Sequence, residues 1–384
     1  MASRREKTYD SIGALILLMN HYGQVSGIPV IKLTQIKLTV AAFLISAALP
    51  VHAARPPSKS WTFTFRLEND LFANTDRLYT NGIKLSWISP EINYFRDLEW
   101  LKKKTEIRKW SRRIIELLPF SKDPDMQRNI ALSVGQKMFT PADISRTDLI
   151  KGDRPYAGWL YGSVALHNKN DRVLNTIEIQ AGLIGAWSLA HETQNFIHGL
   201  RGIDKARGWD NQLGNEFGFS LIYDRKKRVV RRTDFAGQWG VDLITHYGGA
   251  AGTVFTHLDA GAELRLGWNL PTDFGTDLIR PAGDSNAPAD TMDPRYDVRR
   301  TKFSFHVFAA ATGRLVLRDI FLDGNTFSHS YHVDKELFVA DFLVGASLVY
   351  RKIKLSYAQV LRTKEFKAQK SGHNFGSISI SYTY

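Results

Sequence analysis

Ser377-Ile378-Ser379-Ile380-Ser381-Tyr382-Thr383-Tyr384 are the last eight residues of the chain, and an apolar or aromatic side chain occupies every second position. A period of two puts the Ile and Tyr side chains on one face of a β-strand and the Ser and Thr side chains on the other. The run stops on an aromatic residue. A final strand of this form is typical of outer-membrane barrels, where the barrel-assembly machinery recognises it. We therefore expect this strand to lie in the wall of a membrane barrel.

The same alternation recurs along the chain. Trp61, Phe63, Phe65 and Leu67 alternate with Thr62, Thr64, Arg66 and Glu68, and the run from Asp259 to Trp268 repeats the pattern. Further strands are expected at about 80–89, 129–139, 156–166, 173–187, 215–225, 233–247, 302–321, 336–350, 352–362 and 374–384, each near the length that crosses a bilayer. The sequence therefore predicts an all-β fold, a transmembrane antiparallel up-and-down β-barrel of about 12 strands, with a soluble β-sandwich as the alternative.

Composition removes several classes of site. The 384 residues carry a formal net charge of +13 and include no Cys, which excludes disulfides, a thiol nucleophile and a thiolate metal site. The charge would suit nucleic acid, but the dense basic residues lie within 96–113, where Trp100, Ile107 and Trp110 recur at helical spacing. We predict an amphipathic basic helix at a membrane surface and no nucleic-acid partner, with a solvated charged helix as the alternative.

The N-terminal part has the features of a targeting segment. Lys32 and Lys37 precede an apolar run from Leu38 to Leu49, and Val51-His52-Ala53 then supplies a pattern that a signal peptidase accepts. Residues 1–53 are therefore expected to be an N-terminal extension plus a secretory signal peptide, and residues 54–384 an outer-membrane β-barrel with an insertion at 92–127. Beyond the signal no apolar run reaches about 18 residues, so membrane-spanning helices are not expected.

Counting strands from a periplasmic N-terminus divides the connections between the two sides of the membrane. Residues 69–79, 140–155 and 188–213 then face outward, and a short loop helix is expected at about 191–200. The basic insertion 92–127, with its helix, falls on the periplasmic side. The Pro-, Asp- and Gly-rich segment 270–300 falls there too and has the composition of an irregular connection.

Polar residues cluster in the three outward loops. The clusters are Asn69-Asp70 with Asp76-Arg77 and Tyr79-Thr80-Asn81-Gly82, then Lys151-Gly152-Asp153-Arg154, and then Gln194-Asn195 with His198. Carboxylate, amide and hydroxyl oxygens from neighbouring strand ends suit a hard cation such as Ca²⁺, and a neutral His beside them can act as a base. Turn formation explains any one cluster equally well, and a lone rim histidine is more often structural than catalytic.

In this order and at about these separations, the three clusters resemble the lipid A 3'-O-deacylase (LpxR-like) family of outer-membrane barrels. The resemblance spans Trp61 to Tyr384. It implies a twelve-stranded barrel that requires Ca²⁺ and removes the 3'-linked acyloxyacyl group of lipid A, so that lipopolysaccharide is the substrate. By the same resemblance, Asp70 and Thr80 bind the metal, Asn69 is a polar group beside it, and His198 is the general base.

Two positions depart from the family pattern. The family has Glu six residues after the catalytic His, where this chain has Asp204, so an orienting role for Asp204 is an expectation only. A family lysine in the loop after the third strand has no clear match, because that loop offers Ser145 and Arg146. The alternatives to a lipid A deacylase are an outer-membrane phospholipase, which usually needs a Ser nucleophile, and a porin-like or structural barrel without enzymatic activity.

Overall fold

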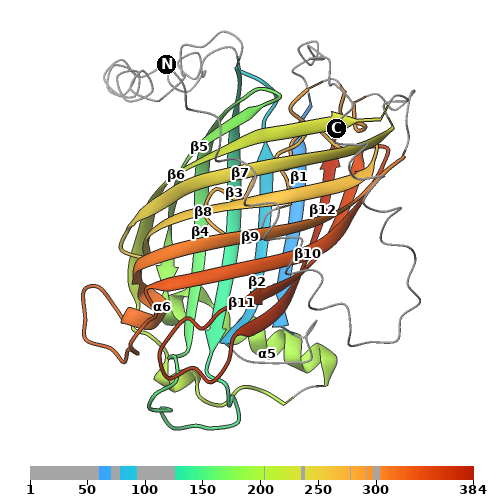
Figure 1. Ribbon diagram of the computed structural model, residues 1–384. Coiled ribbons are helices and arrows are strands. Elements are labelled where there is room, and N and C mark those ends of the chain that lie inside the picture. The colour runs from blue at the N-terminus through green and yellow to red at the C-terminus, as the bar shows by residue number, and fades with distance from the viewer. Residues whose placement is uncertain are drawn as a thin grey trace, which may run out of the picture. The chain divides into compact units, whose positions relative to one another are not determined.

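The computed structural model describes residues 60–70, 78–92, 126–202, 204–234, 238–276, 278–290, 292–296 and 303–384. Twelve antiparallel strands make one closed barrel in which each strand pairs with its neighbours in sequence and β1 pairs with β12 (Figure 1). The strands are β1 (Thr62–Asn69), β2 (Leu78–Ile88), β3 (Gln127–Thr140), β4 (Ala157–Lys169), β5 (Val173–Ile184), β6 (Glu216–Thr233), β7 (Trp239–Gly252), β8 (Phe255–Trp268), β9 (Phe303–Asp319), β10 (Phe338–Tyr350), β11 (Ile353–Arg362) and β12 (His373–Thr383). The predicted barrel and its strand number are therefore confirmed.

Side chains alternate between the lumen and the lipid face as the sequence pattern predicts. On β12, Ile380 and Tyr382 are about half exposed, whereas Ser379 and Ser381 are buried in the lumen. Exposed large apolar side chains occur on every strand from β3 to β12, which is the surface that a hydrocarbon layer requires. Since a closed barrel also leaves no strand edge unpaired, every wall strand can satisfy its backbone hydrogen bonds in lipid.

The predicted bounds of the sixth and seventh strands are wrong. The sixth strand is expected to end near residue 225, but β6 continues to Thr233. The seventh is expected at about 233–247, but β7 runs from Trp239 to Gly252. The sequence Asp224-Arg225-Lys226-Lys227-Arg228 suggests a loop, yet the side chains of Asp224, Lys226 and Arg228 point into the lumen and are buried there.

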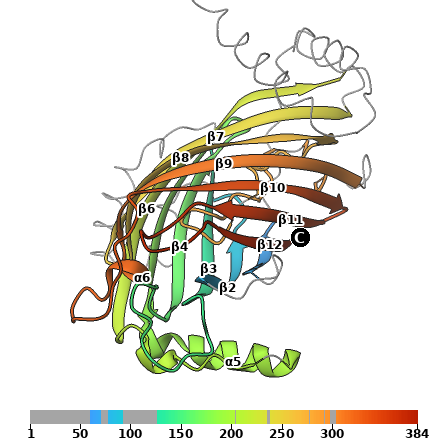
Figure 2. The same cartoon turned by 60° about the horizontal axis from the view of Figure 1, so that its bottom comes forward.

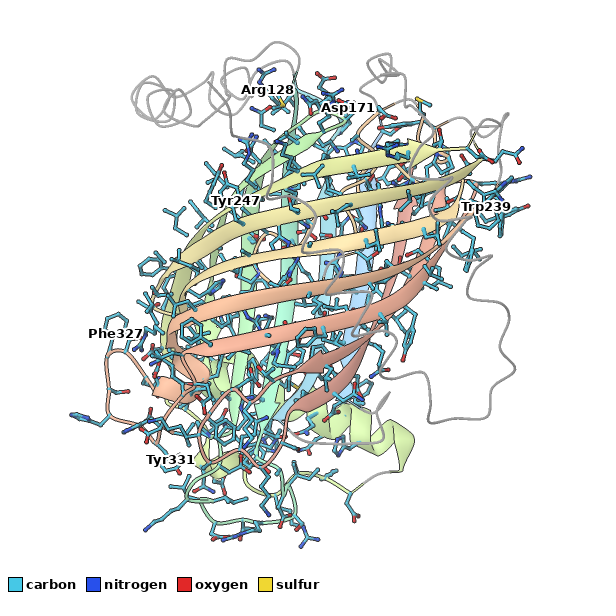
Figure 3. The ribbon with its side chains drawn as sticks, in the orientation of Figure 1. Arg128, Asp171, Trp239, Tyr247, Phe327 and Tyr331 are labelled. Carbon is cyan, nitrogen blue, oxygen red and sulfur yellow. The ribbon has the colours of Figure 1, made fainter. Side chains whose placement is uncertain are left out.

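Most connections differ in length between the two ends of the barrel. The β4–β5, β6–β7 and β10–β11 connections are short and lie at the same end as both termini of the wall, whereas the β3–β4, β5–β6 and β9–β10 connections at the other end are longer. The exceptions are the short β7–β8 connection at the outer end and the long β2–β3 and β8–β9 connections at the end of the termini. Short turns are periplasmic and long loops are external in such barrels. Figure 3 labels Arg128, Asp171 and Trp239 at the periplasmic end, and Phe327 and Tyr331 at the outer end.

The expected loop helix is confirmed at the outer end. It is α5 (Ala190–Arg201), preceded by η3 (Gly185–Ser188) and followed by η4 (Trp209–Asn211), and a single turn, α6 (Ile320–Asp323), follows β9. Neither α-helix in the described part of the chain is long and apolar enough to cross a bilayer. The predicted signal segment and most of the basic insertion, residues 93–125, lie outside the described residues.

The β8–β9 connection does not stay at the periplasmic end as expected. Its described residues between 270 and 296, here called the lumen segment, are irregular but fold into the barrel. Ile279 N donates to Glu68 on β1, Ala282 N to Glu178 on β5, and Asn286 Nδ2 to Thr64 on β1 and Ser381 on β12. Lys169 on β4, the neighbour of β5, donates to Pro288 O at 2.9 Å.

Charge pairing explains why this segment enters the lumen. Lys84 lies 2.8 Å from Asp284, and Asp273 lies 2.7 Å from both Arg265 and Lys354 and 2.8 Å from Arg295. Isolated cations on the inner wall would carry a large desolvation cost, which the Asp carboxylates of the segment offset. From the sequence, the composition of this segment predicts an irregular connection, but it does not identify the wall residues that pair with its Asp side chains.

A filled lumen predicts a barrel that conducts little current. Between Ile279, Arg280 and the outer residues Arg362 and Glu365 there remains a cavity of about 70 Å³, which has room for only a few waters. We expect the purified protein to give near-baseline conductance in planar bilayers, and a variant with residues 278–290 replaced by a short Gly-Ser linker to conduct more. Stable open-channel currents from the unaltered barrel would contradict this prediction and favour a porin.

Candidate active site on the outer face of the wall

The candidate site is built on the lipid-facing side of the wall, at the outer ends of four strands. Asn69 on β1 pairs in register with Asn81 on β2, Asn81 with Met138 on β3, and Met138 with Gly158 on β4. Paired residues in an antiparallel sheet point to the same side. Asn69 also alternates with Phe63, Phe65 and Leu67, so this row faces away from the lumen. Although this is the lipid-facing side, Asn69, Asn81 and Met138 are buried, and we call this row the site floor.

Helix α5 covers the site floor. The chain leaves β5 through η3 and then packs α5 against β4 and β3, so the helix runs across the strands toward β2 and β1 (Figure 2). Ala190, Gln194 and His198 are spaced by four residues and form its buried face. From Ala190 to His198 the helix advances about 12 Å, while neighbouring strands lie about 4.8 Å apart. Because Ala190 lies over Gly158 on β4, His198 is carried to the β1–β2 side of the floor.

His198 is held in a defined orientation. Its ring Nδ1 lies 2.6 Å from the backbone carbonyl oxygen of Asp204, so Nδ1–H donates and Nε2 keeps the lone pair. The side chain of Asp204 is exposed, and the recorded contact is made by its main chain. The shorter acid at this position therefore does not disturb the hydrogen bond to His198.

Two further polar groups belong to the site, Gln194 and Asn81, which are part of the sequence motifs but were given no role there. Gln194 Oε1 accepts from Trp209 Nε1 at 2.7 Å, and Gln194 Nε2 is buried without a partner among the described residues. Asn81 Oδ1 is likewise buried with no hydrogen-bond partner in the described part of the chain. Gln194 stands four residues before His198, so helical periodicity could have placed it on the same face. Asn81 could be placed in the site only from the β1–β2 register, which pairs it with Asn69.

The β1–β2 register also determines where Asp70 and Thr80 lie relative to each other. Asn69 and Asn81 are the last pair of the β1–β2 ladder, so the next positions set Asp70 opposite Thr80. Asp70 is completely buried. Strand alternation predicts that Asp70 points with Glu68, but β1 ends at Asn69, so the alternation does not extend to Asp70. A bulge separates Tyr79 from Asn81, and the side chain of Thr80 lies outside the described part of the structure.

The donors at this corner fit a hard cation better than a transition metal. The Asp70 carboxylate and the Asn69 and Asn81 amide groups provide oxygens, and Ca²⁺ binds carboxylate, amide, backbone and water oxygens together. Within the described ranges no three His, Asp or Glu side chains gather as a metal site. A cation here would therefore use one carboxylate with neutral oxygens.

The Lys151-Gly152-Asp153-Arg154 motif is architectural. Asp153 accepts from Ala142 N, and Arg154, which is buried, pairs with Glu365 of the β11–β12 loop at 3.2 Å and lies over the Phe139 ring. Burial acts to raise the pKa of the Glu365 carboxyl, but Arg362 and Arg154 outweigh it and hold that pKa below its ordinary value. This pair joins two loops across the outer mouth rather than contributing to the site floor.

Arg146 lies in the loop where the family has a lysine. Its guanidinium is bound to the Asp148 carboxylate, and both side chains are exposed. The same loop is tied to the chain after α5, since Arg207 N donates to Ile144 O at 2.9 Å and Asn211 Nδ2 to Thr147 O at 2.8 Å. The β3–β4 loop therefore braces the segment that carries the Asp204 carbonyl.

Gly158 predicts how strongly the site depends on the position of α5. A Cβ at Gly158 would lie 2.0 Å from Ser188 Oγ and 2.3 Å from Ala190 Cβ, so Gly158→Ala must displace the start of the helix. We expect Gly158→Ala to lower any catalytic turnover at this site by about 10- to 100-fold, because α5 carries His198 and small misplacements of a catalytic group have effects of this size. The control is Gly162→Ala on the same strand, where the new Cβ meets nothing closer than 3.8 Å. Equal turnover in both variants would contradict the proposed seating of α5.

Comparison with known proteins agrees with this architecture. The family model described as outer membrane protein LpxR matches residues 38–384. LpxR from Salmonella typhimurium has the same fold, with a TM-score of 0.64 and 17% identity over 84% of this chain and 99% of that one. The β domain of the Bordetella autotransporter BrkA is more distant, with a TM-score of 0.37 and 8% identity over 85% of this chain and 98% of the other. No curated protein sequence matches the chain. Because the family model covers nearly the whole barrel, this chain belongs to the family of the outer membrane protein LpxR.

Proposed function

We propose that this chain is a Ca²⁺-dependent ester hydrolase that removes the 3'-linked acyloxyacyl chain from lipid A in the outer leaflet of the outer membrane. The observation that supports this most is the burial of His198 against the outside of the wall, with its Nδ1–H bound to the Asp204 carbonyl oxygen, which makes Nε2 the basic nitrogen of the neutral ring. Membership of the LpxR family supports the lipid A substrate.

The residues of the site suit direct attack by water. His198 Nε2 takes a proton from a water molecule as the water oxygen attacks the ester carbonyl carbon, and the resulting imidazolium stays bound to the Asp204 carbonyl oxygen through Nδ1–H. When the tetrahedral intermediate collapses, the ester C–O bond breaks, the acyl chain leaves as a carboxylic acid, and the imidazolium returns its proton to the leaving sugar oxygen. The free N–H of Gln194 Nε2 can donate to the oxygen that becomes negative as the ester carbonyl is attacked. Asp70, Asn69 and Thr80 are the residues proposed to hold Ca²⁺, which when bound supplies positive charge that stabilises this oxyanion.

A serine-based phospholipase is less well supported. Ser188, the serine next to α5, donates its hydroxyl to the Gly185 carbonyl oxygen at 2.6 Å and is buried against Gly158. A serine nucleophile would instead need its hydroxyl directed at a base. The filled lumen likewise argues against the porin-like alternative.

The test uses purified, detergent-folded protein with lipid A and, separately, with glycerophospholipids. Mass spectrometry should show loss of one acyloxyacyl group from lipid A in Ca²⁺, no loss in EGTA, and recovery when Ca²⁺ is restored. Unchanged lipid A together with release of fatty acid from glycerophospholipid would transfer the proposal to the phospholipase. Unchanged spectra for both lipids in Ca²⁺ would refute hydrolysis by this site.

A further inference from the structure

The polarity of α5 is inverted relative to a helix on a water-soluble protein. Such a helix buries its apolar residues and exposes its polar ones. Here Gln194 and His198 are only 2% and 3% exposed, whereas Phe196 between them is 66% exposed. The buried face points toward the site floor on the wall, so Phe196 points away from the barrel.

Two neighbouring apolar side chains share this exposure. Trp187 in η3 and Leu189 at the start of α5 are both more than half exposed. Leu189 has a backbone φ of 56°, in the left-handed region that residues other than Gly, Asn and Asp rarely adopt. In water, glycine would be the better residue at this position, because glycine relieves the backbone strain and exposes no apolar side chain. In a lipid environment the exposed leucine side chain is no longer unfavourable, so only the backbone strain remains.

These side chains continue the lipid-facing surface of the barrel. Trp187 N donates to Asn215 Oδ1 at 3.0 Å, which places η3 beside the outer end of β6. On that strand, Phe217 and Phe219 are exposed on the face that meets the hydrocarbon layer. The apolar surface therefore extends from β6 over Trp187 and Leu189 to Phe196. We call Trp187, Leu189 and Phe196 the α5 apron.

We propose that the α5 apron is embedded among the acyl chains of the outer leaflet and binds the acyl chains of the lipid substrate beside the site. This inference rests on the proposed function for its substrate, but not for its position in the membrane. Glu192 is exposed one turn before Phe196, which sets the helix at the interface rather than deep in the hydrocarbon. Trp187 is the residue type that prefers this depth.

The experiment measures the depth directly, because a chain without Cys accepts one nitroxide label at any introduced Cys. Phe196→Cys is compared with Phe219→Cys on the lipid-facing wall and with Asp148→Cys on the exposed β3–β4 loop, each reconstituted in phosphatidylethanolamine–phosphatidylglycerol vesicles. We expect the Phe196 label to collide with oxygen and to be shielded from a nickel chelate, as at Phe219. Nickel collisions equal to those at Asp148 would overturn the proposal, and so would protection from both reagents, which indicates contact with protein.

A second arm tests the apron as a substrate surface. Phe196→Ser should lower kcat/KM for lipid A in vesicles by about 10- to 100-fold, the loss that corresponds to one apolar side chain. Glu192→Gln on the same face is the matched control and should stay near the unaltered protein. If the label is shielded from nickel but the protein does not hydrolyse lipid A, the membrane position of the apron is supported and the proposed function is contradicted. If the protein hydrolyses lipid A but the label is exposed to water, the proposed function is supported and the position of the apron is contradicted.

Discussion

His198→Ala should reduce the turnover of lipid A by about 10²- to 10⁴-fold, the usual contribution of a positioned general base. The loss arises because Nε2 is the basic nitrogen of the neutral ring when Nδ1–H is bound to the Asp204 carbonyl oxygen. His198→Gln should lose as much, since an amide fills the space but cannot take up a proton. Acyl release measured by mass spectrometry under initial-rate conditions gives the value.

The controls for this result separate chemistry from folding. His329→Ala removes an exposed histidine on the β9–β10 loop and should leave turnover within about twofold, as surface substitutions away from a site usually do. Asp204→Ala should also retain most activity, because the contact with His198 is made by the main-chain oxygen and survives loss of the carboxylate. A loss at Asp204 as large as at His198 would show that the side chain acts in the folded enzyme. Heat-modifiable migration in gels verifies that each barrel has folded.

Most of the barrel wall was predictable from the sequence, because the alternation of apolar and polar residues within each strand specifies which face of that strand meets lipid. In Phe63–Glu68 or Ser377–Tyr384, alternation alone specifies which side chains face lipid. The predicted boundaries were wrong at Asp224–Thr233, where charged residues continue a strand whose inner side chains form hydrogen bonds and an ion pair with groups from elsewhere in the chain. Local sequence carries no information on such partners. The β8–β9 connection was placed wrongly for the same reason.

The candidate site was predictable only in part. The motifs and their resemblance to a family selected Asn69, Asp70, Thr80, Asp204 and His198, and the register brings Asn69 and Asp70 beside Thr80. The sequence could not show that α5 crosses the outside of the wall, because this depends on the close approach at Gly158. It also could not show that Asp204 contacts His198 through its carbonyl oxygen, or that Arg154 pairs with Glu365 at the outer mouth. These features depend on tertiary contacts.

Asp273→Asn is expected to destabilise the barrel by about 3–5 kcal/mol, the cost of leaving buried charges without their partner. The carboxylate of Asp273 lies 2.7 Å from Lys354 Nζ, and among the described residues this is the only acid paired with that lysine. Arg265 and Arg295 also keep Asp242 and Asp293 as partners, so Lys354 loses most. Urea unfolding of the purified barrel, followed by Trp fluorescence, measures the change. Asp334→Asn, at an exposed position, is the control and should stay within about 0.5 kcal/mol.

A double variant distinguishes charge from packing as the cause. Lys354→Met alone should also destabilise, because Asp273 then faces two cations instead of three, but Asp273→Asn with Lys354→Met should recover part of the loss. Burial acts to raise the pKa of Asp273, but Lys354, Arg295 and Arg265 outweigh it and hold that pKa far below its ordinary value. The stabilisation is therefore complete above about pH 4 and is lost as the pH falls toward the lower folded-state pKa. Additive losses in the double variant, with no recovery, would show that Asp273 matters for the shape of the lumen segment rather than for its charge.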